Sequence, residues 1–439
     1  MQQKKKLALA VLIQSALVST AFASEQSESK GFVEDAEGSV LFRTGYLTRD
    51  KKNGVADTSS FAQTAIVKLD SGFTQGTVGF GVGIIGDASF KLGENGHTGN
   101  DMLPTHPQDN PDGTKDAYDH WARGGAYLKA RVSNTTATYG TQVLDLPVLA
   151  SNTARLVPEY YTGVLVESNE IENLSLTAGK FTENQLSDQI NSDGAELDRA
   201  VVWGAKYQFN DNLNASYYGA DIKDRLDRHY INTNYSYALA NDSTLTHDFS
   251  GYYTKWDKEA NQYLYSQIGS PDDSFDNTIL ALSTTYNHGP HNVMVAYQQN
   301  FGNTGYDYGL GTGVGDGKQS IYLPNSYLSD FIGNDEKSVQ LQYTFDFGAV
   351  NVPGLSWTSA FVYGWDIKAS NNAGTMISDN EHEREFFNQV KYTVQSGFAK
   401  DTSLRLRHSY YRASDAYETT YIGDTNEWRI WLDIPVKLF

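Results

Sequence analysis

EWRIWLDIPVKLF, the stretch from Glu427 to Phe439, alternates between apolar and polar residues. Successive side chains of a β-strand point to opposite faces, so one face of this stretch carries Trp428, Ile430, Leu432, Ile434, Val436 and Leu438. The other face carries Arg429, Asp433 and Lys437. A strand of a soluble sandwich also alternates, but it is seldom this long and is not expected to end a chain on an aromatic residue. The pattern favours the last strand of a membrane β-barrel, which pairs with the first strand so that no edge stays open in lipid.

The first residues of the chain predict export. Three lysines, Lys4 to Lys6, precede an apolar run from Leu7 to Val18, and small residues follow up to Ala23. This is the order of a secretory signal peptide. We therefore predict a signal peptide over residues 1–23 and a transmembrane β-barrel domain over residues 24–439. An uncleaved anchor is the alternative, but the apolar run is too short to span a bilayer as a helix.

The composition fits a barrel better than a helical membrane protein. After Ser24 there is no run of about 18 apolar residues, which excludes membrane-spanning helices. Aromatic residues make up 13% of the chain, and membrane barrels need aromatic rings at both rims. The mean hydropathy of −0.49 is no objection, because every lipid-facing residue of a barrel strand alternates with a polar one that faces the lumen.

Cysteine content and net charge exclude several kinds of function. The chain has no cysteine, so Cys-ligated zinc, iron–sulfur clusters and thiol catalysis are excluded. The formal net charge of −19 argues against nucleic-acid binding. We expect no cofactor and no metal site.

Short turns and long connections alternate along the chain. Turn residues stand at Asn173, at Asn210 and Asp211, and at Asn241 and Asp242. Longer connections are expected over residues 182–198, 257–276, 301–336, 367–383 and 414–426. Outer-membrane barrels show this asymmetry, with the long loops outside the cell. We predict an all-β, antiparallel transmembrane barrel of about 18 strands.

One connection, from Leu144 to Gly163, is too apolar for an exposed loop. Its apolar residues are Leu144, Leu146, Val148, Leu149 and Val157. Leaving them together in water would be costly, so we expect the segment to fold inward and pack on the barrel wall. The alternative is one more pair of strands, which Pro147 and Pro158 disfavour.

Three consecutive strands of the predicted barrel place basic residues on the lumen face. These residues are Lys391, Arg405, Arg407 and Arg429. Cations in a channel with low-dielectric walls concentrate anions, and rows of Arg and Lys make pores favour anionic solutes. Arg also binds a carboxylate through two parallel hydrogen bonds. The alternative is that inward-pointing acids, such as Asp346 and Asp433, neutralise these cations, which would then only stabilise the wall.

Several blocks of sequence, in order along the chain, carry a resemblance to a known family. They are KGF at 30–32, SGFTQGTVGFG at 71–81, AGKFTE at 178–183, VPGL at 352–355, YTVQSG at 392–397, the spacing of Arg405, Arg407 and Arg412, and the closing strand. On these blocks the chain resembles the OprD-type substrate-specific porins of Gram-negative outer membranes.

The resemblance implies a barrel whose third loop folds into the lumen and forms a narrow eyelet. It implies passive diffusion of small carboxylate-bearing solutes, such as amino acids or aromatic and organic acids, along a basic ladder. Carried over to this sequence, the ladder is Arg49, Arg155, Lys391, Arg405, Arg407 and Arg429, with Arg155 on the inward loop. The family's opposing acidic pocket maps to Asp330. The expected partners are these solutes, outer-membrane lipid and lipopolysaccharide, with the protein as a monomer or weak homotrimer.

Two other functions remain as alternatives. An outer-membrane barrel enzyme of the lipase or protease type would need a catalytic constellation, and the sequence has no G-x-S-x-G motif. A structural or adhesive barrel would tolerate neutral residues in place of the lumen cations, whereas a solute pore would not. We predict that the protein is a channel and not an enzyme.

Overall fold

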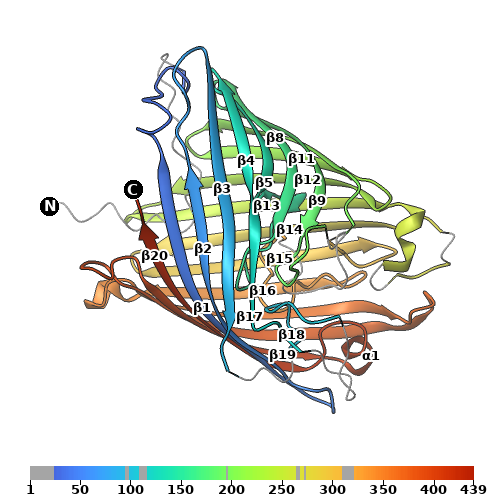
Figure 1. Cartoon of the computed structure of the whole chain (residues 1–439). Coiled ribbons are helices and arrows are strands. Elements are labelled where there is room, and N and C mark those ends of the chain that lie inside the picture. Colours follow the sequence, from blue (N-terminus) through green and yellow to red (C-terminus); the bar gives the residue numbers. More distant parts are fainter. Residues whose placement is uncertain are drawn as a thin grey trace.

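The computed structural model describes residues 24–93, 98–107, 116–193, 196–263, 267–270, 273–308 and 321–439. The predicted signal peptide, residues 1–23, lies outside the described residues. In the described ranges, 18 strands form one sheet, and each pairs antiparallel with its neighbours (Figure 1). Strand β20 pairs with β1 from Ser39 opposite Lys437 to Lys51 opposite Thr425, which closes the barrel. The predicted all-β transmembrane barrel is confirmed.

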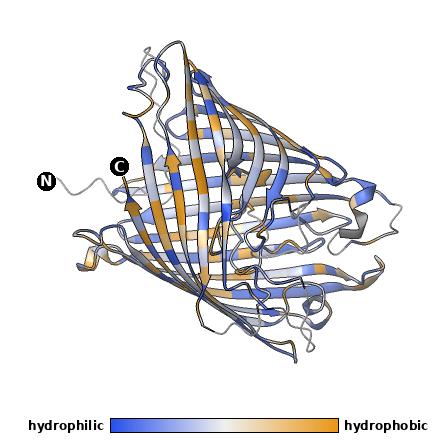
Figure 2. Cartoon of the chain, viewed as in Figure 1, coloured by the Kyte–Doolittle hydropathy of each residue, from blue (hydrophilic) through white to orange (hydrophobic). Residues whose placement is uncertain are grey.

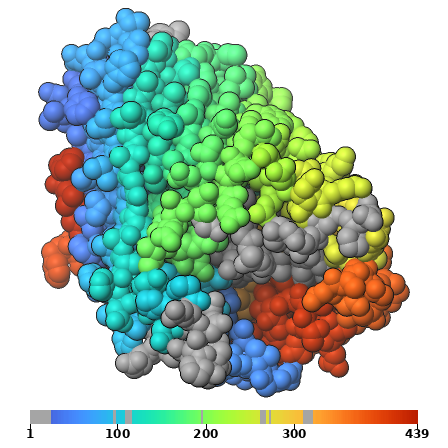
Figure 3. Space-filling view, turned by 45° about the vertical axis from the view of Figure 1, so that its right-hand side comes forward, coloured from blue at the N-terminus to red at the C-terminus, as the bar shows by residue number. Residues whose placement is uncertain are grey.

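The strands of the barrel follow one another around the wall in chain order. They are β1 (Glu37–Lys51), β2 (Thr58–Asp70), β3 (Val78–Lys91), β4 (His120–Val132), β5 (Thr135–Gln142), β8 (Tyr160–Ile171), β9 (Leu174–Gln185), β10 (Ala200–Asn210), β11 (Leu213–Ile222), β12 (Leu226–Ala238), β13 (Ser243–Trp256), β14 (Asp276–His288), β15 (His291–Gly302), β16 (Lys337–Asp346), β17 (Leu355–Ser370), β18 (Met376–Thr393), β19 (Ser403–Ala413) and β20 (Thr425–Lys437). Figure 3 shows neighbouring strands packed side by side over the outer surface, as bands of colour from blue to green.

Alternation along the strands separates the lipid face from the lumen face. In β20, Trp428 and Ile430 are exposed on the outer wall, whereas Arg429 between them is fully buried inside. Figure 2 shows the same alternation of apolar and polar residues along other strands. The strands therefore place their polar residues inside a bore, as the period of two predicts.

The two ends of the barrel differ in the length of their connections. Two-residue turns at 133–134, 172–173, 211–212 and 289–290 lie at the end where β1 begins and β20 ends. The long connections 92–119, 143–159 and 303–336 lie at the opposite end, which is the extracellular end of an outer-membrane barrel.

The prediction of a long connection over residues 367–383 is wrong. Strand β17 continues to Ser370 and β18 begins at Met376, and the two strands stay paired past Gly364 through several register shifts. Polar residues here reflect strands that extend beyond the lipid into water, where alternation with apolar residues is no longer required.

Helices are few and short. The described chain contains two 3₁₀ helices, η1 (Lys258–Tyr263) and η2 (Phe347–Val350), and one α-helix, α1 (Asp415–Glu418). None of the helices in the described ranges has the length and apolar character required to cross a membrane.

The connection between β5 and β8, residues 143–159, folds into the lumen as predicted. Its apolar residues Leu144, Leu146 and Leu149 are buried. Tyr252 on β13 donates a hydrogen bond to the Pro147 carbonyl oxygen at 3.0 Å, so the loop reaches a wall far around the barrel from β5. The alternative of an extra strand pair reduces to β6 (Asp145–Leu146) and β7 (Leu149–Ala150), a small hairpin that is not part of the barrel sheet.

Candidate functional site

One wall of the lumen, built by β18, β19, β20 and β1, collects basic residues in successive rows. From the periplasmic side outward, the rows are Ser403–Asp433–Arg43, Lys391–Arg405–Trp431, Arg407–Arg429–Leu47 and Ser409–Glu427–Arg49. The register therefore brings together Arg49, Lys391, Arg405, Arg407 and Arg429, five of the six residues of the ladder that the family resemblance implies. We call this surface the basic wall.

Two arginines of the basic wall share one carboxylate. Arg49 Nε donates to Glu427 Oε2 at 2.8 Å, and Arg429 Nε donates to the other oxygen, Oε1. Arg429 is fully buried and Arg49 nearly so. For these two residues the structure agrees with the alternative that lumen cations are neutralised by acids and hold the wall together.

Arg43 on β1 belongs to the basic wall, although the sequence did not single it out. Its Nε lies 2.7 Å from Asp433 Oδ1 and its Nη2 lies 3.0 Å from Oδ2, a two-pronged ion pair. Its Nη1 donates to the Arg155 carbonyl oxygen at 3.1 Å. The signal that could have found it is the pairing of the first and last strands, which sets Arg43 opposite Asp433.

Three cations of the basic wall keep their charge available. Among the described residues, Lys391, Arg405 and Arg407 have no acidic side chain within ion-pair distance. The Arg407 guanidinium instead lies 5.0 Å from the centroid of the Phe387 ring.

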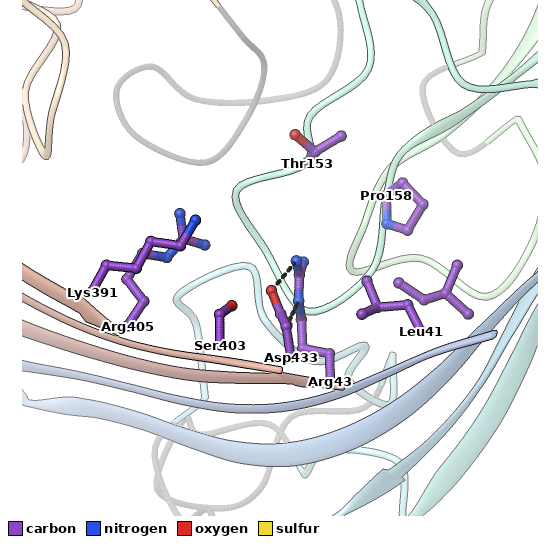
Figure 4. Close-up of a pocket in the computed structure, with 9 residues that line it drawn as sticks. Leu41, Arg43, Thr153, Pro158, Lys391, Ser403, Arg405 and Asp433 are labelled. Atoms are coloured by element: carbon purple, nitrogen blue, oxygen red, sulfur yellow. Dashed lines mark hydrogen bonds and ion pairs between the residues drawn. The ribbon is translucent and has the colours of Figure 1, made fainter. Parts of the chain in front are cut away.

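Lys391 and Arg405 face a cavity of about 380 Å³. Figure 4 shows their side chains next to each other, pointing into the bore toward the inward loop that carries Thr153. The lining residues are Leu41, Arg43, Ile66, Thr153, Pro158, Lys391, Ser403, Arg405 and Asp433. A solute in this cavity would meet two unneutralised cations on one side and a largely apolar surface on the other.

Arg155 lies on the inward loop, as the resemblance implies, but its side chain is fully buried. Its Nε donates to the Asn100 carbonyl oxygen at 3.0 Å, and its Nη2 lies 3.8 Å from Asp101 Oδ2. Burial lowers the pKa of Arg155, and the charge of Asp101 opposes this effect. The residue fastens the inward loop to the connection between β3 and β4.

Asp330 differs from the expectation of an acid that faces the ladder. It lies in the connection 303–336, it is 4% exposed, and the hydroxyl groups of Tyr308 and Ser326 donate to its carboxyl group. Burial raises the pKa of Asp330 well above its usual range, and the charges of Glu385 and Glu383 add to the shift. Its carboxyl group is occupied inside a folded loop.

The connection 303–336 also packs into the barrel, which the sequence did not predict. Arg228 on β12 donates to the Tyr308 carbonyl oxygen at 2.9 Å, and Gln298 on β15 donates to the Phe331 carbonyl oxygen at 2.7 Å. Between this connection, the inward loop and strands β10 to β14 lies a second cavity of about 390 Å³. We call it the tyrosine cavity because its lining includes Tyr218, Tyr230 and Tyr322.

Glu159 holds the end of the inward loop in place. The oxygens of its carboxyl group accept hydrogen bonds from the Asn152 backbone N–H at 2.9 Å and from Asn184 Nδ2 at 2.5 Å. Burial raises the pKa of Glu159 to about 7. In the described part of the chain, no group of three or more His, Asp or Glu side chains is arranged to hold a metal ion.

Comparisons with known proteins agree with this architecture. The model of the family "outer membrane porin, OprD family" matches residues 30–438. Porin D of Pseudomonas aeruginosa is 36% identical over 448 residues, which cover 96% of this chain and 95% of that protein. The crystal structure of Acinetobacter baumannii OccAB1 is similar with a TM-score of 0.89 and 65% identity, over 95% of this chain and 100% of that chain.

A further solved relative was crystallised with a small molecule. The structure of Pseudomonas aeruginosa OpdK with vanillate is similar with a TM-score of 0.80 and 25% identity, over 93% of this chain and 100% of that chain. Porins are channels rather than enzymes, and their setting is the outer membrane of Gram-negative bacteria. The chain therefore belongs to the OprD family of substrate-specific outer-membrane porins.

Proposed function

We propose that this porin lets small carboxylate-bearing solutes, such as amino acids and aromatic or organic acids, diffuse passively across the outer membrane. The observation that carries the proposal is the free charge of Lys391, Arg405 and Arg407 within the described chain. Arg43, Arg49 and Arg429 stand beside them, each already paired with an acid. A pore lined only by structural ion pairs would not need the unpaired cations Lys391, Arg405 and Arg407.

The spacing of the free cations suits transfer from one to the next. Arg407 is two residues along β19 from Arg405, and Lys391 lies directly opposite Arg405. Two residues of a strand span about 7 Å, so a carboxylate can reach the next cation before it leaves the previous one. Each contact is a charge-assisted hydrogen bond in a wet lumen, strong enough to attract an anion and weak enough to release it.

The rest of the cavity suits the carbon skeleton of such a solute. Leu41, Ile66 and Pro158 also line it, and Figure 4 shows Leu41 and Pro158 across the cavity from Lys391 and Arg405. A small ring or alkyl chain would pack on these side chains while its carboxylate contacts the basic wall. Two relatives support this chemistry, because they were crystallised with vanillate and with glucuronate, both carboxylates.

The test is to remove the two free arginines together by Arg405→Ala and Arg407→Ala. In liposome swelling, entry of benzoate should fall about tenfold, the loss expected for one or two charge-assisted contacts, while a neutral solute of similar size should enter at least as fast. The control is Arg199→Ala with Lys223→Ala, which removes two cations already paired at the extracellular end. Equal loss for both solutes would refute the proposal.

A further inference from the structure

Two arginines stand side by side on the outer surface of the barrel. Arg384 on β18 lies between Glu383 and Glu385, which are both fully buried on the lumen side, so Arg384 points outward. Arg412 on β19 follows the fully buried Tyr411 and also points outward. The register sets Arg384 directly opposite Arg412. Opposite residues have Cβ atoms about 5 Å apart, and like charges at this spacing repel each other.

The pair carries more positive charge than its surroundings neutralise. Arg412 Nε lies 3.5 Å from Asp424 Oδ2, and its Nη2 donates to Asn426 Oδ1 at 3.0 Å. Arg384 is exposed and has no ion-pair or hydrogen-bond partner among the described residues. Among the described residues, one carboxylate, that of Asp424, therefore lies within ion-pair distance of the two arginines. The charge of Asp50 also acts on Arg412, but Asp50 is paired with Lys52, so positive charge remains in excess on this part of the outer wall.

The height of the pair matches the extracellular border of the lipid. Below Arg384, the outward residues of β18 include Phe386, Val390 and Tyr392, all exposed apolar or aromatic side chains. From Tyr392 to Arg384 the strand advances about 27 Å, which is about 20 Å along the barrel axis when strands tilt by about 40°. The apolar band of an outer-membrane barrel is about 25 Å tall, so Arg384 lies near its extracellular border if Tyr392 lies near the periplasmic border.

Aromatic side chains lie next to both arginines. The Arg412 guanidinium lies 3.8 Å from the centroid of the Tyr410 ring, and Tyr363 is the partner of Arg384 on β17. Tyr and Trp mark the level of lipid headgroups on membrane proteins. The two arginines thus lie where phosphates of the outer leaflet lie.

We propose that Arg384 and Arg412 form a binding site for the phosphorylated headgroup of an outer-leaflet lipid. A phosphate accepts two parallel hydrogen bonds from a guanidinium and relieves the repulsion between the two cations. The site belongs to the outer wall and does not depend on what the lumen transports.

Two cations elsewhere on the extracellular end are each paired with an acid. Around strands β10 to β12, Arg199 is paired with Asp221 at 2.8 Å and Lys223 with Asp198 at 2.6 Å. This contrast gives a matched control pair for the experiment, because the same number of positive charges can be removed at a place where each already has an acid.

The test measures lipid bound to the purified porin by native mass spectrometry with bis-phosphorylated lipid A as the probe. The Arg384→Gln and Arg412→Gln double variant should retain at least fivefold less lipid than the wild type, whereas Arg199→Gln with Lys223→Gln should retain the wild-type amount. Lipid A stripped of its phosphates should bind the wild type no better than it binds the double variant. Unchanged single-channel conductance shows that the variant is folded.

Two results would refute the proposal that Arg384 and Arg412 bind a lipid phosphate. One is equal retention of phosphorylated lipid by the wild type and the double variant. The other is equal retention of phosphorylated and stripped lipid by the wild type, which would mean that only the acyl chains are recognised. Competition by inorganic phosphate alone, at a concentration that does not alter the barrel, should displace little lipid, since acyl chains also hold it on the wall.

Discussion

Asp433 should limit how tightly the pore holds an anion, so removing its charge should strengthen anion binding. The Asp433 carboxylate pairs with Arg43 through two contacts of 2.7 and 3.0 Å, and both residues line the cavity of Lys391 and Arg405. The change Asp433→Asn keeps the shape of the side chain. It removes one negative charge from the cavity and leaves the charge of Arg43 unneutralised.

The expected magnitude follows from the size of the cavity. A solute carboxylate in a space of about 380 Å³ comes within about 5 Å of residue 433. Two unit charges at that distance interact by about 0.8 kcal/mol in bulk water and by about 3 kcal/mol at an effective dielectric constant of about 20. The side chains of Arg43 and Asp433 are 14% and 20% exposed, so an intermediate value of about 1–2 kcal/mol applies. That corresponds to about 5- to 30-fold tighter binding.

The assay is blockade of single-channel current by benzoate at low salt, with the residence time and the half-blocking concentration as readouts. Asp211→Asn is the matched control, because it removes the same charge at an exposed turn between β10 and β11. Unchanged or weaker blockade in Asp433→Asn, with conductance intact, would refute the assignment of this cavity to anions.

Three further predictions concern the inward loop. Because burial raises the pKa of Glu159 from its usual 4.5 to about 7, the packed loop favours the protonated form, so its stability should fall as pH rises from about 4.5 to 7. Single-channel current should fluctuate more at pH 8 than at pH 5, and Glu159→Gln should remove this difference. Deleting residues 146–150 should raise the conductance, and an unchanged value would show that this part of the loop does not narrow the bore. Arg155→Gln should increase current fluctuations with less effect on benzoate blockade than Arg405→Ala, because Arg155 is buried between two loops; the reverse order would place Arg155 in the solute path.

The orientation of strand residues could be predicted because it depends only on local alternation. Arg405 and Arg407 alternate with Leu404 and Leu406, and in the folded barrel the leucines face outward while the arginines line the bore. The same logic placed Arg429 inside. Strand β1 lacks this alternation, because Val40, Leu41 and Phe42 are apolar residues on both faces, so the sequence does not single out Arg43.

Loop residues could not be placed because their surroundings come from distant parts of the chain. Arg155 is covered by the connection between β3 and β4, and Asp330 by hydroxyl groups of its own folded connection. Neither contact has a periodic signal in sequence. The polar stretch at 367–383 was wrongly predicted to be a long connection for another reason. Strands that extend beyond the lipid lose the alternation of apolar and polar residues that identifies strands within it.

In the proposed function, Lys391, Arg405 and Arg407 receive the carboxylate of the solute. The most direct test is a crystal structure of the porin with 4-bromobenzoate, with the bromine located by its anomalous signal. We expect bromine in the cavity between the basic wall and the inward loop, with the carboxylate within hydrogen-bond distance of Lys391 or Arg405. A ligand found only in the tyrosine cavity, or one whose carboxylate points away from the basic wall, would contradict it.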